Sequence, residues 1–185
     1  MDEVKKYLKE KYKKPGAVFL GLVHRLDRNV SGIVLFAKTS KGASRISEQF
    51  RNREVNKIYH AVVGGRFNPP KGVLRHSLIK EEDKKIARVS NEGKESELYY
   101  ETIKSNGKFS LLRVEPLTGR FHQIRVQLSQ AGHPIVGDKK YGYPEVLPDG
   151  SIALAATSLS FKTATGEQEI NLEIDYPESW NLLLK

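Results

Sequence analysis

Apolar residues at helical spacing open the chain. Val4, Tyr7, Leu8 and Tyr12 lie three or four positions apart with lysines between them. This pattern is typical of an amphipathic helix on a protein surface. A Pro-Gly pair at positions 15–16 follows, and such a pair ends a helix.

Two apolar runs come next, at positions 17–23 and 33–37. Both predict buried strands, because short apolar runs between turn residues are typical of strands in a core. Ser40 can cap the following helix, whose buried face would carry Ile46 and Phe50.

The rest of the chain alternates between apolar segments and turn residues. Further strands are predicted at 57–64, 97–103, 109–114, 152–161 and 170–176. Asn106 and Gly107 form a favourable turn between two of these strands. The polar interval 80–95 predicts an exposed hairpin, which we expect to be the most mobile region.

One helix is predicted late in the chain. Phe121, Ile124 and Leu128 have helical spacing, and Gly132 can end that helix. A short closing helix is expected at 177–184.

Strands outnumber helices, and several connections are hairpin-like. The fold class is therefore α+β, with a mixed, mainly antiparallel sheet and flanking helices. The chain has 185 residues, no internal repeat and no linker, so we expect residues 1–185 to form a single domain.

The composition indicates a class of binding partner. Lys and Arg number 31 against 22 Asp and Glu, a net charge of +9. Such an excess favours a polyanionic partner such as RNA, although solubility alone would also explain it. Cysteine is absent, which excludes disulfides and thiol catalysis. No apolar run approaches the roughly 20 residues of a membrane span, so we expect a cytoplasmic protein. We also expect a monomer.

Two basic segments carry the candidate chemistry, at positions 24–28 and 119–126. Asp27 lies among His24, Arg25 and Arg28, and nearby positive charge favours the ionised form of a carboxylate. Arginines can also hold phosphate. Alternatively, Asp27 is an ordinary turn acid. Arg125 could pair with a buried acid or contact phosphate at the surface.

Other candidates are weaker. Tyr59 lies in a predicted strand and could be core, or could offer its ring to a base. The five histidines form no His-x-x-x-His pair, so a metal site is not expected. Phosphate-binding and dinucleotide-binding glycine motifs are also absent, and no cofactor is expected.

Three ordered segments resemble a known family. HRLDRNVSG at positions 24–32 resembles the HRLDxxTSG motif of RluA-type RNA pseudouridine synthases, and KIYHAVVG at 57–64 is similar to their Lys-x-Tyr strand. LTGRFHQIR at 117–125, continuing into GHPIVGD at 132–138 and the Tyr-Gly pair that follows, resembles their third motif. The resemblance spans nearly the whole chain.

The resemblance implies a fold, an activity and residue roles. The fold would be the pseudouridine synthase catalytic domain, and the reaction would isomerise uridine to pseudouridine in ribosomal or transfer RNA without cofactor or metal. Asp27 would be the catalytic aspartate and Arg125 its salt-bridge partner. Tyr59 would stack on the target base, while Arg25 would replace the flipped nucleotide in the RNA stack. The expected RNA contacts are His24, Arg25, Arg28, Arg120, His122 and Gln123.

The chain also departs from the family pattern. The family has two strands with a Lys-Pro-x-Gly segment well before HRLD, whereas only 23 residues precede it here. We therefore expect a truncated N-terminal edge, and no S4-type RNA-binding domain. Phe121 stands where the family has threonine. One alternative is an impaired family member that only binds RNA. Another is a metal-dependent nuclease, but this chain has no cluster of acids spaced to hold a magnesium ion.

Overall fold

The computed structural model describes residues 1–185 and divides them into two compact units. The larger unit comprises Asp27–Ile33, Asn56–Leu159 and Leu172–Lys185. The smaller unit comprises Met1–Leu26, Val34–Val55 and Ser160–Asn171. None of the helices combines the length and apolarity that a membrane crossing requires.

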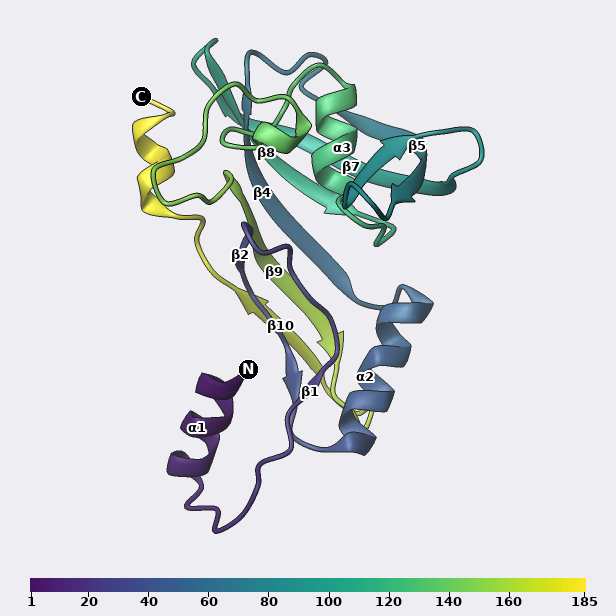
Figure 1. The fold of residues 1–185 in the computed structure, drawn as a ribbon, viewed down its shortest axis with the longest axis vertical. Helices are drawn as coiled ribbons and strands as arrows, with labels where there is room; N and C mark the ends of the chain where they lie inside the picture. Colours follow the sequence, from purple (N-terminus) through teal and green to yellow (C-terminus); the bar gives the residue numbers. More distant parts are fainter. The chain divides into compact units, whose positions relative to one another are not determined.

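Most residues of an eight-stranded sheet belong to the larger unit (Figure 1), although the end of β9 and the start of β10 belong to the smaller one. Its strands run in the order β10-β9-β4-β8-β7-β5-β6, and β2 pairs with β9 outside this path. Their bounds are β2 (Ser31–Gly32), β4 (Asn56–Gly64), β5 (Lys71–Glu81), β6 (Ile86–Val89), β7 (Lys94–Ser105), β8 (Phe109–Pro116), β9 (Leu154–Lys162) and β10 (Glu169–Glu173).

The pairing confirms the predicted sheet type. The pairs β4–β8, β8–β7, β7–β5 and β5–β6 are antiparallel, whereas β2 runs parallel to β9. The predicted turn between β7 and β8 is present, and Gly107 adopts φ +86° there. That backbone conformation suits glycine, which has no Cβ to clash.

The core covers both faces of the central strands, because Leu111 and Leu112 are consecutive in β8, point to opposite faces and are both buried. Val62, Leu98, Leu111 and Leu112 are fully buried together with Leu128 of α3 (Gln123–Gln130). Each such side chain stabilises the fold by about 1.5–3 kcal/mol. Helix α3 packs on β5 and β6 (Figure 1), so the sheet fixes the position of its side chains.

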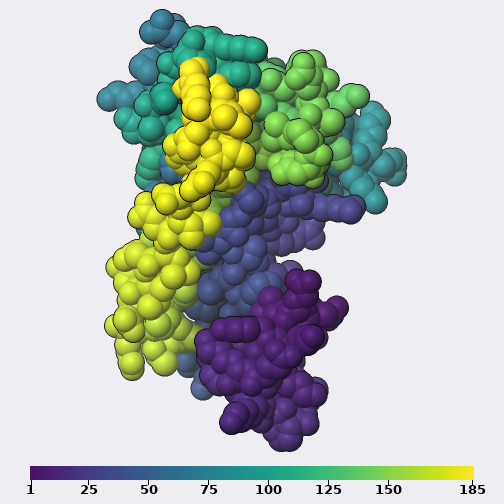
Figure 2. Space-filling model, turned by 90° about the vertical axis from the view of Figure 1, so that its left-hand side faces the viewer, coloured from purple at the N-terminus to yellow at the C-terminus, as the bar shows by residue number.

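The C-terminal segment completes the larger unit. Asn106 donates hydrogen bonds to the carbonyls of Leu183 (3.0 Å) and Lys185 (2.8 Å). Figure 2 shows this segment in yellow, lying against teal and green parts of the same unit. The predicted closing helix is a 3-10 helix, η2 (Glu178–Leu182), with Trp180 buried.

The smaller unit contains two α-helices. The predicted N-terminal helix is α1 (Asp2–Lys11), with Leu8 buried. The second is α2 (Ser40–Asn52). Its cap is Thr39, whose Oγ1 accepts a hydrogen bond from the Gly42 amide at 3.0 Å, and not Ser40 as the sequence suggested. Ser40 already has helical geometry, one residue too late to cap.

The two apolar runs of the smaller unit do not form the predicted buried strands. Only β1 (Gly21–Leu22) and β3 (Phe36–Ala37) are strands, and they pair with each other alone. Phe19 and Leu22 each remain 47% exposed. A two-stranded ribbon has no further strand to cover it and buries few of its side chains.

The predicted hairpin at 80–95 is formed by β5 and β6, but it is not exposed throughout. Its turn at 82–85 is exposed, whereas Ala87 is buried in a cluster with Leu78, Val126 and Tyr141. The polar composition of the hairpin concealed this contact, because a single alanine gives little signal in a pattern of charges.

A close backbone approach at Gly32 predicts a sharp stability effect. Gly32 has φ +123°, and a Cβ at this position would overlap the backbone of Ala156 in β9. We expect Gly32→Ala to lower the free energy of unfolding by about 3 kcal/mol or more. Gly107→Ala, with positive φ and open space around it, should cost only about 1–2 kcal/mol. Urea denaturation measures both, and equal losses would contradict the steric argument.

Candidate active site

Asp27 begins a tight turn at the edge of the larger unit. Its carbonyl accepts a hydrogen bond from the Val30 amide at 3.0 Å. Asn29 anchors this turn, because its side chain donates to the Gly150 carbonyl at 3.1 Å and its carbonyl accepts from the Ile152 amide at 3.0 Å. The backbone carbonyl of Asp27 therefore closes the turn, while its carboxylate contacts Arg125.

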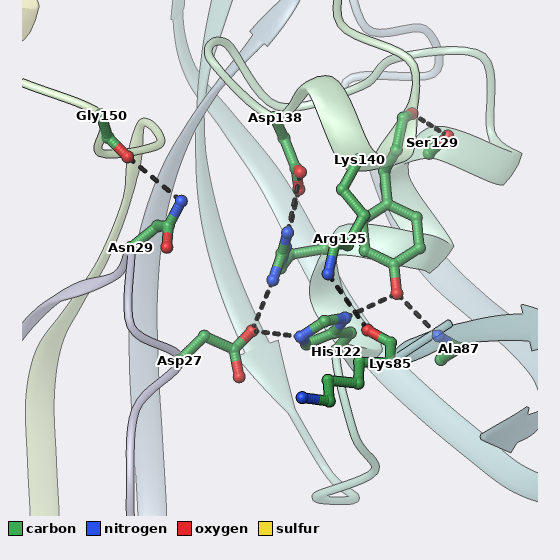
Figure 3. Close-up of polar contacts among 11 residues, drawn as sticks. Asp27, Asn29, Lys85, Ala87, His122, Arg125, Ser129, Asp138, Lys140 and Gly150 are labelled. Atoms are coloured by element: carbon green, nitrogen blue, oxygen red, sulfur yellow. Dashed lines mark hydrogen bonds and ion pairs between the residues drawn. The ribbon is translucent and has the colours of Figure 1, made fainter. Parts of the chain in front are cut away.

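The guanidinium of Arg125 joins two carboxylates (Figure 3). Its Nη1 donates to Asp27 Oδ2 at 3.0 Å. Its Nε and Nη2 donate to Asp138 Oδ2 and Oδ1 at 2.7 and 2.8 Å. Arg125 and Asp138 are buried, whereas the Asp27 side chain is 25% exposed. The predicted contact between Arg125 and Asp27 is present in the structure.

The two acids control the charge of this arginine. Burial alone would lower the pKa of Arg125, but its hydrogen bonds to Asp138 and Asp27 and their negative charges outweigh burial and raise it. A bidentate pair also fixes the plane of the guanidinium. Asp138 therefore orients Arg125 so that one nitrogen remains for Asp27.

His122 approaches the same carboxylate. It lies just before α3 with φ 51°, and its Nε2 is 3.5 Å from Asp27 Oδ2. Phe121 stacks on its ring with centroids 3.8 Å apart. Burial, followed by the positive charge of Arg125, lowers the pKa of His122 to about 4, so the imidazole is neutral at neutral pH.

Tyr141 sets the orientation of this imidazole. Its hydroxyl oxygen accepts a hydrogen bond from the Ala87 amide at 2.8 Å and lies 2.7 Å from His122 Nδ1. Burial raises the pKa of Tyr141 to about 12, so it keeps its proton. Tyr141 keeps its proton and its oxygen already accepts from Ala87, so we assign Tyr141 as the donor to Nδ1 and place the remaining proton of His122 on Nε2.

Tyr59 lies in β4 opposite Val114 of β8 and is half-buried. Burial and, as a smaller contribution, the negative charge of Asp27 raise its pKa to about 12. The phenol is therefore neutral and close enough to Asp27 to sense its charge. Stacking on a base stays a prediction for this ring.

Gln123 and Arg120 form hydrogen bonds to other groups of the protein. Gln123 is buried, and its amide oxygen accepts from Thr118 Oγ1 at 2.7 Å and from the Arg120 amide at 3.0 Å. Its amide nitrogen donates to the Glu97 carbonyl at 3.0 Å. Arg120 Nε donates to the Glu95 carbonyl at 3.2 Å. Both residues position the loop before α3, and their RNA contacts stay predictions.

Three candidates remain: His24, Arg25 and Arg28. His24 belongs to the smaller unit, where its Nε2 accepts from the Leu35 amide at 2.9 Å and its ring stacks on Phe50. Arg25 in the smaller unit and Arg28 in the larger unit are exposed. Both arginines are accessible for RNA, and these contacts also stay predictions.

Sequence reasoning missed the roles of Asp138 and Tyr141. Both lie in the third motif, and η1 (Lys139–Tyr141) connects them. The only signal was an acid and a tyrosine next to glycines, and Gly137 and Gly142 do adopt positive φ. The structure contains no group of three or more His, Asp or Glu placed to hold a metal ion.

The arrangement provides an oriented carboxylate for chemistry. Asp27 is partly accessible, and its neighbours hold it through one oxygen, Oδ2. A carboxylate of this kind can act as a nucleophile or a base. Neutral His122 and Tyr141 add hydrogen bonds without adding charge.

Sequence comparison gives relatives for most of the chain. Residues 1–130 match the family described as RNA pseudouridylate synthase. The ribosomal large subunit pseudouridine synthase C of Vibrio parahaemolyticus is 36% identical over 170 residues, covering 88% of this chain and 54% of that protein. The protein of that name from Haemophilus influenzae is 44% identical over 132 residues, covering 70% and 41%. The chain thus spans about half the length of these relatives.

Solved structures have the same fold. Human RNA pseudouridylate synthase domain containing 4 superposes with a TM-score of 0.81 and 25% identity, covering 97% of this chain and 80% of that one. Human RNA pseudouridylate synthase domain containing 1 gives a TM-score of 0.76 at 23% identity, covering 100% and 78%.

The buried ion pair predicts a large effect at Asp138. Asp138→Asn removes one charge and leaves the buried guanidinium of Arg125 incompletely paired, so the free energy of unfolding should fall by about 3–5 kcal/mol. Asp149→Asn is the control, since Asp149 is exposed and bonds only to Ser151; it should cost about 1 kcal/mol or less. Urea denaturation compares them, and similar losses would argue against a structural role for the pair.

The lowered pKa of His122 predicts a pH effect on stability. The folded state favours the neutral ring, so this stabilisation is complete above pH 6.5 and is lost as the pH falls towards 4. His122→Asn removes the titrating group, and asparagine tolerates positive φ. Wild type should therefore lose more unfolding free energy than His122→Asn between pH 7 and pH 5. Parallel pH profiles would refute the assignment.

Proposed function

Because this chain belongs to the RNA pseudouridylate synthase family, we propose that it isomerises uridine to pseudouridine in RNA, with Asp27 as the catalytic carboxylate. The observation that carries the proposal is the bond between Asp27 and buried Arg125. It joins the two basic segments, 98 positions apart, that match the family pattern.

Two routes fit a carboxylate at this position. In one, Asp27 gives an electron pair to C1′ of the ribose while the N1–C1′ pair leaves with the uracil. In the other, Asp27 takes the C2′ proton, whose electron pair forms a C1′–C2′ double bond as the uracil leaves. In both routes the uracil turns and C5 bonds to C1′. In the first this displaces the Asp27 carboxylate, and in the second the electron pair of the C1′–C2′ double bond takes the proton back from Asp27 at C2′. The carboxylate is thereby restored, and the uracil loses the C5 proton and gains one on N1. No oxidant or reductant is required.

The target uridine must leave the RNA stack, which costs a few kcal/mol. We propose that Tyr59 offsets part of this cost by stacking on the uracil, since its ring is neutral and the charge of Asp27 acts on it. Arg25 would occupy the space that the nucleotide leaves, because a planar guanidinium can stack and still contact phosphate. The net charge of +9 supports binding of the RNA backbone.

The substrate class follows from the relatives. Those with 36–44% identity are named for the ribosomal large subunit, so we propose ribosomal RNA of the large subunit, rather than transfer RNA, as the first substrate to test. Single-stranded loops are the usual targets of such recognition, because their bases can be turned out of the stack.

The decisive variant is Asp27→Asn. It keeps the shape of the side chain but removes the charge, so pseudouridine formation in large-subunit RNA should fall at least about 100-fold. The dissociation constant for the same RNA should change less than about twofold. Exposed Asp175→Asn is the matched control and should retain activity. Wild-type protein that binds RNA without forming pseudouridine would favour the RNA-binding alternative.

A further inference from the structure

The two side chains that approach the Asp27 carboxylate use the same oxygen. Arg125 Nη1 lies 3.0 Å from Oδ2, and His122 Nε2 lies 3.5 Å from it. Figure 3 draws both dashed lines to this one atom. No hydrogen bond is formed to Oδ1. The two oxygens of Asp27 therefore differ before any substrate arrives.

We propose that His122 is a positioning residue that, with Arg125, holds Oδ2 of Asp27 and so makes Oδ1 the oxygen that reacts with the ribose. The inference rests on the proposed function and assigns the reacting atom within it. Oδ1 would form the bond to C1′ in the first route, or take the C2′ proton in the second. In either route the electron pairs move as they do in the proposed reaction, with Oδ1 as the reacting atom of Asp27.

A neutral imidazole suits this task better than a charged one. An imidazolium would place a second positive charge beside the carboxylate and could give it a proton, which would remove the nucleophile. A neutral N–H donor orients Oδ2 and leaves the negative charge on Asp27. The pKa of His122, lowered by burial and by Arg125, agrees with this role.

The tautomer of His122 is fixed from outside the site. The Ala87 amide, on β6, donates to the Tyr141 hydroxyl, and we assign this hydroxyl as the donor to His122 Nδ1, which lies 2.7 Å away. This leaves the N–H of His122 on Nε2, the nitrogen nearest Asp27. The edge strand β6 therefore determines which nitrogen carries the proton next to the reacting carboxylate.

The plane of the ring is fixed as well. Phe121 stacks on one face with centroids 3.8 Å apart, and Tyr141 meets the ring edge-on at 5.5 Å. Lys80 lies over Phe121 at 5.0 Å. Phe121 stands where the family pattern has threonine, so this stack is a feature of the present chain.

The distance of 3.5 Å is longer than a fully formed hydrogen bond. Contacts of catalytic groups are often long before substrate binds and shorten in the complex. We therefore expect the imidazole to contribute mainly to kcat, with little effect on the KM for RNA.

Chemical rescue tests the proposal directly. His122→Gly leaves a ring-sized space, and glycine adopts the φ of 51° without strain. We expect kcat to fall about 10- to 100-fold, which corresponds to about 1.4–2.7 kcal/mol, with KM unchanged. Added imidazole should restore much of the loss. Added 1-methylimidazole should not, because it fills the space without an N–H to offer Oδ2.

A second pair of variants tests the outer end of the chain of hydrogen bonds. Tyr141→Phe removes only the hydroxyl that fixes the tautomer, so kcat should fall several-fold with KM unchanged. Tyr100→Phe is the control, because Tyr100 is also a buried tyrosine but lies in the core cluster with Leu98 and Phe67. It should leave kcat unchanged.

Nitrogen-15 NMR of the wild-type protein separates this proposal from the proposed function, because it needs no activity. His122 should be the Nε2–H tautomer at pH 7, and Tyr141→Phe should mix the tautomers. A protonated ring or an Nδ1–H tautomer in wild type would overturn the proposal. So would full kcat in His122→Gly, or equal rescue by both compounds or by neither. An inactive wild type with the expected tautomer would instead contradict the proposed function.

Discussion

The arrangement of the site depends on one guanidinium held between two carboxylates. Asp138 takes two nitrogens of Arg125 and leaves a third for Asp27. Burying such charges contributes little net stability, because desolvation offsets most of the Coulombic attraction. The ion pair between Arg125 and Asp138 instead fixes the geometry of the site. A bidentate pair fixes the plane of the guanidinium, and this plane fixes the direction from which Asp27 is held.

A helix buried on all sides supplies that rigidity. The six residues 123–128 of α3 are all buried, although three of them are polar. Each buried polar side chain needs partners, because an unpaired group would cost about 1–3 kcal/mol. Gln123 bonds to Thr118 and Glu97. Gln127 donates to the Leu74 carbonyl at 3.0 Å, while its buried amide oxygen has no partner. These bonds hold α3 in register with the strands, so Arg125 has little freedom.

The sequence predicted the sheet and half of the site. Alternating and apolar runs identify β4, β7 and β8 because buried sheet strands have a strong periodic signal. The contact between Asp27 and Arg125 came from motif resemblance. Asp138 and Tyr141 gained their roles only in three dimensions, since no local pattern reveals which arginine a buried acid will meet. The apolar run containing Phe19 failed as a buried strand because burial depends on a partner strand, which periodicity does not report.

The electrostatics of binding and of chemistry are separated in this chain. Asp27, Arg125 and Asp138 together carry one net negative charge, which by itself would repel the phosphates of RNA. The net charge of +9 over the whole chain reverses that repulsion at longer range. Near Asp27, His122 and Tyr141 are both neutral and add no charge. Surface lysines and arginines would therefore attract the proposed RNA substrate without neutralising the carboxylate proposed to react, because distance and solvent screen their charge.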